Sequence, residues 1–197
     1  MSQVFKGEKV VPITLIESGP NFVTQVKTKE KDGYPAVQVG FGTRKEKNIK
    51  KPQRGHLKKV QNSNLKNQNL RYLREFRVDA TELKLGDEVK ISELSAGDKV
   101  TAIAISKGKG FQGVVKRHGF HGGPKSHGQK DRHRAPGSIG ASWPQFTIKG
   151  MRMAGRMGGD KKTIKNLEIV EIDGENNIIA VKGAIPGRRG TLVMLKG

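Results

Sequence analysis

Short runs of β-branched and aliphatic residues, separated by turn residues, recur in the first half and at the end of this chain. The runs that read as strands are 10–16, 22–26, 36–39, 100–105, 167–172, 178–181 and 191–195. Ser18-Gly19-Pro20 and Asp32-Gly33 separate the first three, as expected of turns between strands. Residues 173–177 give the last pair a hairpin spacing. The pattern predicts a mainly β fold with minor α content, closed into a small barrel.

A different periodicity follows the first three strands. Apolar residues three apart suggest one face of a helix. They are Leu57 with Val60 and Leu70 with Leu73, followed by Phe76. We therefore expect residues 44–75 to form a basic, partly helical insertion in the barrel.

Residues 107–156 have almost no apolar periodicity and are rich in glycine. Fixing a backbone costs roughly 1–2 kcal/mol per residue, and this segment has little apolar surface to offset that cost. A long segment of this kind inside a compact domain indicates function or disorder. We expect an extended arm that is mobile alone and ordered by a partner. Residues 1–43, 76–106 and 157–197 would then form the barrel body.

The distribution of charge indicates the partner. The chain carries 38 Lys and Arg against 18 Asp and Glu, a formal net charge of +20. Residues 44–75 hold 11 basic and two acidic residues, and residues 107–156 hold 11 basic residues and one acid, Asp131. The rest is nearly neutral. Two concentrated basic segments predict binding to a polyanion, which would be nucleic acid or an anionic membrane surface.

The sequence excludes several other classes of protein. No stretch approaches the roughly 20 apolar residues of a membrane-spanning helix, and the N-terminus reads as neither a signal nor a typical transit peptide. A cytoplasmic location is therefore expected. The chain has no cysteine, which rules out disulfides, thiolate nucleophiles and Cys-based zinc sites.

Two motifs in the arm resemble sites of other chemistry. Residues 108–113 match G-x-G-x-x-G, but we expect no helix after the third glycine, and the only nearby acid, Asp131, sits among basic residues, so a dinucleotide site is not expected. His118, His121, His127 and His133 have spacings that fit no common zinc site, and hydrogen bonds to phosphates or stacking on bases suit them better. The serines near them have no carboxylate placed to orient a base. We expect no metal, no cofactor and no enzymatic activity.

Trp143 is the only tryptophan of the chain. A lone tryptophan is usually part of a core, but here glycine, serine and proline surround it without an apolar stripe. This context favours an exposed ring that stacks on RNA.

Several segments in order along the chain resemble the ribosomal protein L3 family in its bacterial form. The main one is SKGKGFQGVVKRHGF, residues 106–120. The others are residues 11–20, 23–27, 123–128, 134–140, 149–155 and 181–187. Together they cover nearly the whole chain, which is far more specific than the isolated glycine motif.

The resemblance implies a body with a barrel of the translation-protein type and an arm that runs through large-subunit ribosomal RNA toward the peptidyl-transferase region. It also implies RNA binding early in assembly, with ribosomal proteins L14 and L19 as neighbours. Residues 138–145 would form the arm's apex. Membrane and small-molecule substrates are not expected. The predicted RNA-binding residues are Lys58, Lys59, Lys107, Lys109, Phe111, Lys116, Arg117, His118, His121, Lys125, His127, Lys130, Arg132, His133, Arg134, Ser138, Trp143, Lys149, Arg152 and Arg156.

Composition leaves one alternative from another class open. An assembly factor that visits ribosomal RNA transiently would have the same charge distribution. A DNA-binding regulator fits less well, because no helix-turn-helix or zinc finger is visible and an extended arm suits folded RNA better than a duplex groove.

Overall fold

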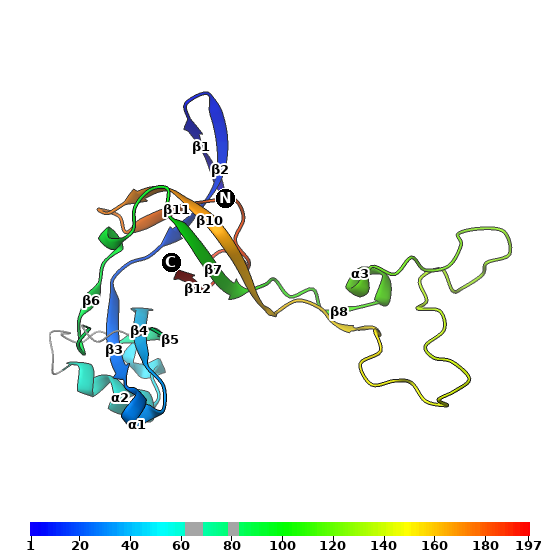
Figure 1. The fold of residues 1–197 in the computed structure, drawn as a ribbon, viewed down its shortest axis with the longest axis horizontal. Helices are drawn as coiled ribbons and strands as arrows, with labels where there is room; N and C mark the ends of the chain where they lie inside the picture. The colour runs from blue at the N-terminus through cyan, green and yellow to red at the C-terminus, as the bar shows by residue number, and fades with distance from the viewer. Residues whose placement is uncertain (62–68, 79–82) are drawn as a thin grey trace. The chain divides into compact units, whose positions relative to one another are not determined.

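The computed structural model of the chain describes residues 1–61, 69–78 and 83–197 (Figure 1). It divides into two compact units. The first unit contains Met1–Val100, Asn166–Ala184 and Gly197. The second unit contains Thr101–Lys165 and Ile185–Lys196.

The largest sheet has six strands in the order β1-β2-β11-β10-β7-β12. They are β1 (Ser2–Lys6), β2 (Lys9–Glu17), β11 (Ile178–Lys182), β10 (Lys161–Asp173), β7 (Lys99–Ile105) and β12 (Val193–Lys196). The predicted hairpin between β10 and β11 is confirmed, with Asp173 opposite Ile178. The Asp173 carboxylate accepts hydrogen bonds from the backbone N–H groups of Glu175 and Asn176. Asn177 adopts a left-handed conformation with φ of 55°, a geometry that asparagine tolerates better than most residues.

The second sheet lies in the first unit and has the order β5-β4-β3-β6. Its strands are β3 (Asn21–Lys27), β4 (Ala36–Thr43), β5 (Leu70–Phe76) and β6 (Glu88–Val89). The helices of the first unit are α1 (Lys29–Asp32), η1 (Glu46–Asn48), α2 (Lys51–Gln61) and η2 (Ile91–Glu93). Apolar alternation places Ile169, Ile179 and Val181 in the core, each at most 1% exposed. Burial of each side chain contributes roughly 1.5–3 kcal/mol.

The prediction of a closed barrel is wrong for the described part of the chain. Both larger sheets are open, ending in β1 and β12 and in β5 and β6. Alternation and turn spacing identify strands, but closure depends on strand tilt and stagger and on which strands pair across long separations. Local sequence patterns do not carry that information.

Residues 44–75 were expected to form a basic, partly helical insertion, and the two apolar pairs on which this expectation rests lie in different kinds of element. Leu57 and Val60 are buried in α2, as their spacing indicates. Leu70, Leu73 and Phe76 do not continue a helix, because residues 70–76 form β5 and pair with β4. Leu73 lies opposite Gly40, and a Cβ on that glycine would overlap the Leu70 side chain. Packing against β4 therefore decides the conformation of this segment over its local spacing.

Candidate nucleic-acid interface

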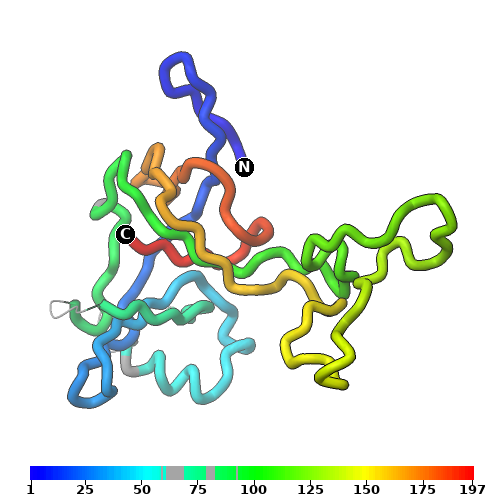
Figure 2. Tube along the Cα trace, turned by 45° about the vertical axis from the view of Figure 1, so that its right-hand side comes forward, coloured from blue at the N-terminus to red at the C-terminus, as the bar shows by residue number. Residues whose placement is uncertain are grey.

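The second unit contains residues 107–156, which we call the arm. The chain segments 106–112 and 155–160, at the two ends of the arm, run antiparallel, and we call this pair the neck. Ser106 donates a backbone hydrogen bond to Asp160 at 2.9 Å, and Met157 exchanges 2.9 Å bonds with Lys109 and Gly110. Strands β8 (Phe111–Gln112) and β9 (Gly155–Arg156) extend the pairing. Figures 1 and 2 show the two ends side by side before the chain opens into two loops. The neck gives a glycine-rich segment a defined start and end.

A short helix connects the outgoing side of the neck to the returning side. It is α3 (Val114–His118), which was not expected after Gly113 and has only five residues. The buried Val114 lies at its start, and Gly119 ends it at φ +74°. Arg117 Nη1 and His118 Nε2 both donate to the carbonyl oxygen of Met153, at 2.7 Å and 3.0 Å. Two side chains of one helix therefore bind the same backbone carbonyl on the returning segment.

The first loop, residues 119–135, is closed by a pair of hydrogen bonds. The Gly123 N–H donates to the His133 carbonyl at 2.9 Å, and His133 Nδ1 donates to the Pro124 carbonyl at 3.0 Å. A Cβ on Gly122 would overlap the His133 carbonyl oxygen, so the approach requires glycine. His121 and His127 lie exposed on this loop.

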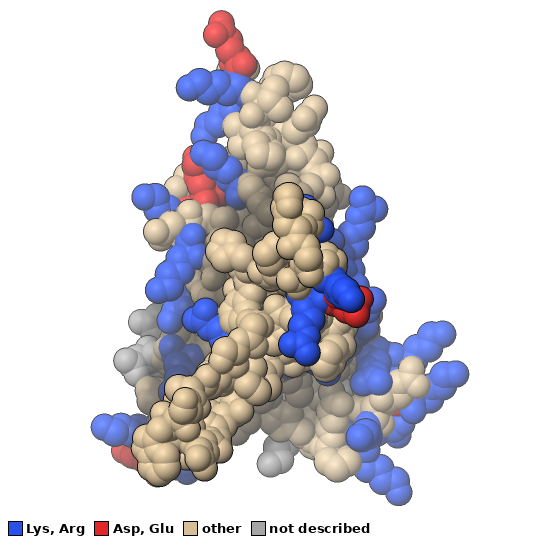
Figure 3. All heavy atoms as spheres, turned by 90° about the vertical axis from the view of Figure 1, so that its right-hand side faces the viewer, with Lys and Arg blue, Asp and Glu red and all other residues tan. Residues whose placement is uncertain are grey.

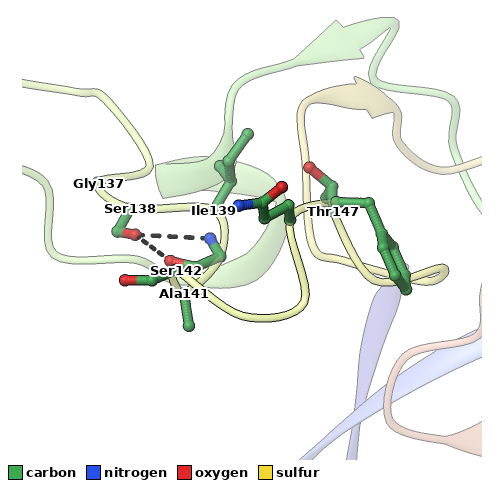
Figure 4. A pocket seen from close by; sticks show the side chains of 9 residues that line it. Gly137, Ser138, Ile139, Ala141, Ser142 and Thr147 are labelled. Atoms are coloured by element: carbon green, nitrogen blue, oxygen red, sulfur yellow. Dashed lines mark hydrogen bonds between the residues drawn. The ribbon is translucent and has the colours of Figure 1, made fainter.

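The second loop, residues 136–153, contains the predicted apex and forms an open hollow of about 550 Å³ (Figure 4). The Ser138 hydroxyl donates to the Gly140 carbonyl at 2.7 Å and accepts from its N–H at 3.5 Å. Phe146 and Gln145 also line the hollow, which contains no charged side chain. Trp143 is 83% exposed, as predicted. The apex thus presents a tryptophan ring, amides and hydroxyls to its surroundings.

The charged side chains of the second unit are almost all positive. It holds 17 Lys and Arg residues and two acids, Asp131 and Asp160. The four ion pairs found among the described residues all lie in the first unit. On the face shown in Figure 3, Lys and Arg side chains are widely spread and acidic ones are few. None of the cations of the second unit forms an ion pair with another described residue.

Most of the predicted RNA-binding residues are exposed. Arg117 and His118 are half-buried because of their bonds to Met153. Lys58 is exposed on α2 in the first unit, and Lys59 lies outside the residues whose side chains are described. The other predicted residues, all in the arm, are Lys107, Lys109, Phe111, Lys116, His121, Lys125, His127, Lys130, Arg132, His133, Arg134, Ser138, Trp143, Lys149, Arg152 and Arg156, and each is exposed.

Two further features were searched for, a metal site and a membrane-spanning helix. Within residues 1–61, 69–78 and 83–197, no three His, Asp or Glu residues are grouped so that they could hold a metal ion. No helix in these same ranges has the length and apolarity needed to cross a membrane.

Three cations beyond the predicted end of the arm belong to the same unit. Lys161, Lys162 and Lys165 lie exposed on the first part of β10, directly after the neck. These lysines were expected to belong to the body, because the predicted arm ends at Arg156. The signal available in the sequence was the close spacing of these three lysines shortly after the predicted arm. Exposed on β10, they add to the positive charge of the same unit.

Comparison with known proteins shows the family. A family model described as ribosomal protein L3 matches residues 75–177. The large ribosomal subunit protein uL3 of Herpetosiphon aurantiacus is 50% identical over 99% of this chain and 91% of its own length. The uL3 proteins of Bacillus cytotoxicus and Pelotomaculum thermopropionicum are 47% and 46% identical over the whole chain, covering 92% and 91% of their own lengths. The chain therefore belongs to the ribosomal protein L3 family, whose members are structural components of the large ribosomal subunit and not enzymes.

Proposed function

We propose that this protein binds large-subunit ribosomal RNA mainly through the second unit, supports early assembly of the subunit, and buttresses the peptidyl-transferase region through its arm. It is located in the cytoplasmic ribosome. L14 and L19 are the proposed protein neighbours. The assembly role, the site reached by the arm and both neighbours rest on the family resemblance.

The observation that carries RNA binding is the set of 17 cations in the second unit, none of which is paired with an acidic group among the described residues. Charge repulsion of this kind opposes a compact state in isolation. Phosphate groups would relieve it and release counterions from the RNA. A protein that carried these charges for solubility would spread them over both units.

The uncharged groups of the arm support RNA over duplex DNA. Trp143 and Phe146 are 83% and 68% exposed on a loop rich in backbone and hydroxyl groups. Exposed rings stack on unpaired bases, which folded RNA offers and a regular duplex does not. His121 and His127 are exposed on the other loop, and their rings can also stack on unpaired bases.

The test is the affinity of the full chain for purified large-subunit ribosomal RNA, measured between 50 and 200 mM salt. If about ten phosphates are neutralised, log affinity falls against log salt with a slope on the order of −7 to −9. A duplex DNA of equal charge is the competitor and should displace the RNA poorly. A nearly salt-independent affinity, or equal binding to the duplex, would contradict the proposal.

A further inference from the structure

We infer that Arg117, His118 and Gly155 form a clasp that sets the direction of the arm, and that Arg117 acts as a positioning residue and not as a phosphate ligand. This inference rests on the RNA-binding role proposed above. It reassigns Arg117 and His118, which the sequence alone places among the residues that contact RNA.

The two donors of the clasp converge on a single backbone oxygen. Arg117 Nη1 lies 2.7 Å and His118 Nε2 3.0 Å from the Met153 carbonyl, 36 and 35 residues along the chain. A carbonyl oxygen has two lone pairs and accepts both bonds. Because the oxygen accepts, His118 carries its hydrogen on Nε2.

Gly155 provides the space that the guanidinium occupies. An ideal Cβ at this position would overlap Arg117 Nη1 and lie 3.0 Å from its Cζ. Gly155 is in β9 and does not have the left-handed backbone that requires glycine. Backbone geometry would allow a side chain here, but its Cβ would have to displace the Arg117 guanidinium.

The helix that carries both donors is itself fixed. Val114 is 3% exposed at its start, and Gly119 ends it with a backbone bond to the Val115 carbonyl at 3.0 Å. The His118 and Phe120 rings lie 6.0 Å apart and tilted by 44°. The clasp therefore joins a short helix to the returning segment at the point where the two loops begin.

Lys116 provides a contrast on the same helix. It is exposed and has no hydrogen bond or ion pair in the fully described second unit, so its charge is available to phosphate. A clasp that orients the loops before binding reduces the ordering cost of association. It thereby raises affinity without adding a phosphate contact.

The experiment measures binding of full-chain variants to purified large-subunit ribosomal RNA across a range of salt concentrations. Gly155→Ala changes no charge and displaces the end of a flexible side chain. We expect it to weaken binding about fivefold to tenfold, the effect of losing one hydrogen bond of ordinary strength, with an unchanged salt slope. Gly108→Ala is the control, because it lies in the same neck with nothing within 4 Å of its Cβ position, and should weaken binding less than twofold.

Three further variants complete the test. Arg117→Gln should weaken binding with little change in slope, whereas Lys116→Gln should make the slope shallower by about 0.9. Combining Gly155→Ala with Arg117→Gln should add nothing to Arg117→Gln alone, since both remove one interaction. His118→Ala tests the same carbonyl without adding an atom to the neck, should Gly155→Ala not fold.

The outcomes separate the two proposals. If the wild-type chain does not bind the RNA, the proposed function fails. If it binds, but Gly155→Ala or, where that does not fold, His118→Ala binds equally well, the clasp is overturned. A slope change near 0.9 for Arg117→Gln would also overturn it and restore Arg117 as a phosphate ligand.

Discussion

Lys27 Nζ lies 2.7 Å from Glu75 Oε1 and joins β3 to β5, two strands that are separated by β4 in the second sheet. Tyr34 links the pair, accepting from Lys27 and donating to Glu75, both at 2.9 Å. The hydrogen bond from Lys27 is the main cause that lowers the pKa of Glu75 below its ordinary value of 4.5. The bond to Glu75 correspondingly raises the pKa of Lys27.

A lowered carboxyl pKa gives stability that is present above the ordinary pKa and is lost as the pH falls through the folded-state value. Glu75→Gln should therefore lower the free energy of unfolding at pH 7 and lose less of it on acidification below 4.5. Urea unfolding between pH 7 and pH 2.5 measures this. Glu46→Gln removes the more exposed pair with Arg54 and should change stability little. Parallel curves for wild type and Glu75→Gln would contradict the assignment.

Two glycines in the first unit should respond in opposite directions to alanine. A Cβ on Gly40 would overlap Leu70 and lie 2.9 Å from Thr24 Cγ2, so Gly40→Ala should cost about 1–3 kcal/mol of stability. Gly55 lies inside α2 with open space around it, so Gly55→Ala should add about 0.5–1 kcal/mol. Urea denaturation measures both. Equal effects of the two substitutions would show that packing at Gly40 is not tight.

The loops of the arm should exchange their amide hydrogens rapidly in RNA-free protein. The described hydrogen bonds of residues 119–153 are few and exposed, so local opening there costs little. Binding to ribosomal RNA should slow the exchange. Hydrogen exchange followed by mass spectrometry compares the free and bound chains. Strong protection of these residues without RNA would contradict an arm ordered by its partner.

The lysines after the neck should count among the RNA contacts. Changing Lys161, Lys162 and Lys165 to glutamine should make the salt slope shallower by about 2 to 3, since each neutralised phosphate contributes about 0.9. Lys29, Lys31 and Lys84 are exposed in the first unit and provide a control with the same change in charge. Equal effects of the two triple variants would mean that net charge, and not this surface, determines affinity.

The sequence predicts the local elements of this fold better than their assembly. Ile13 and Val23 lie in predicted strands and are buried, because alternation directly encodes which face of a strand is covered. Strand β1 has only Val4 and Phe5 as apolar signals and was missed, although it pairs with β2 through Val4 and Val11. Its hairpin depends on pairing, which five residues do not reveal.

In the candidate site too, composition predicts exposure and charge but not which residues contact one another. The context of Trp143 in the sequence correctly predicts that its ring is exposed, whereas the role of residues 107–156 as an arm stays a prediction. Charge and glycine content do not distinguish Arg117 from Lys116, because adjacent cations look alike until the partner Met153 is found 36 residues away. Whether the exposed residues contact RNA remains a prediction.

Sucrose-gradient sedimentation of a native lysate, with and without a high-salt wash, tests the central claim most directly. The protein is followed in each fraction by an antibody. An integral large-subunit protein with its arm embedded in RNA stays with the mature subunit after the wash, and this is the result we predict. Release by the wash, or migration only with immature particles, would contradict it and favour a transient assembly factor.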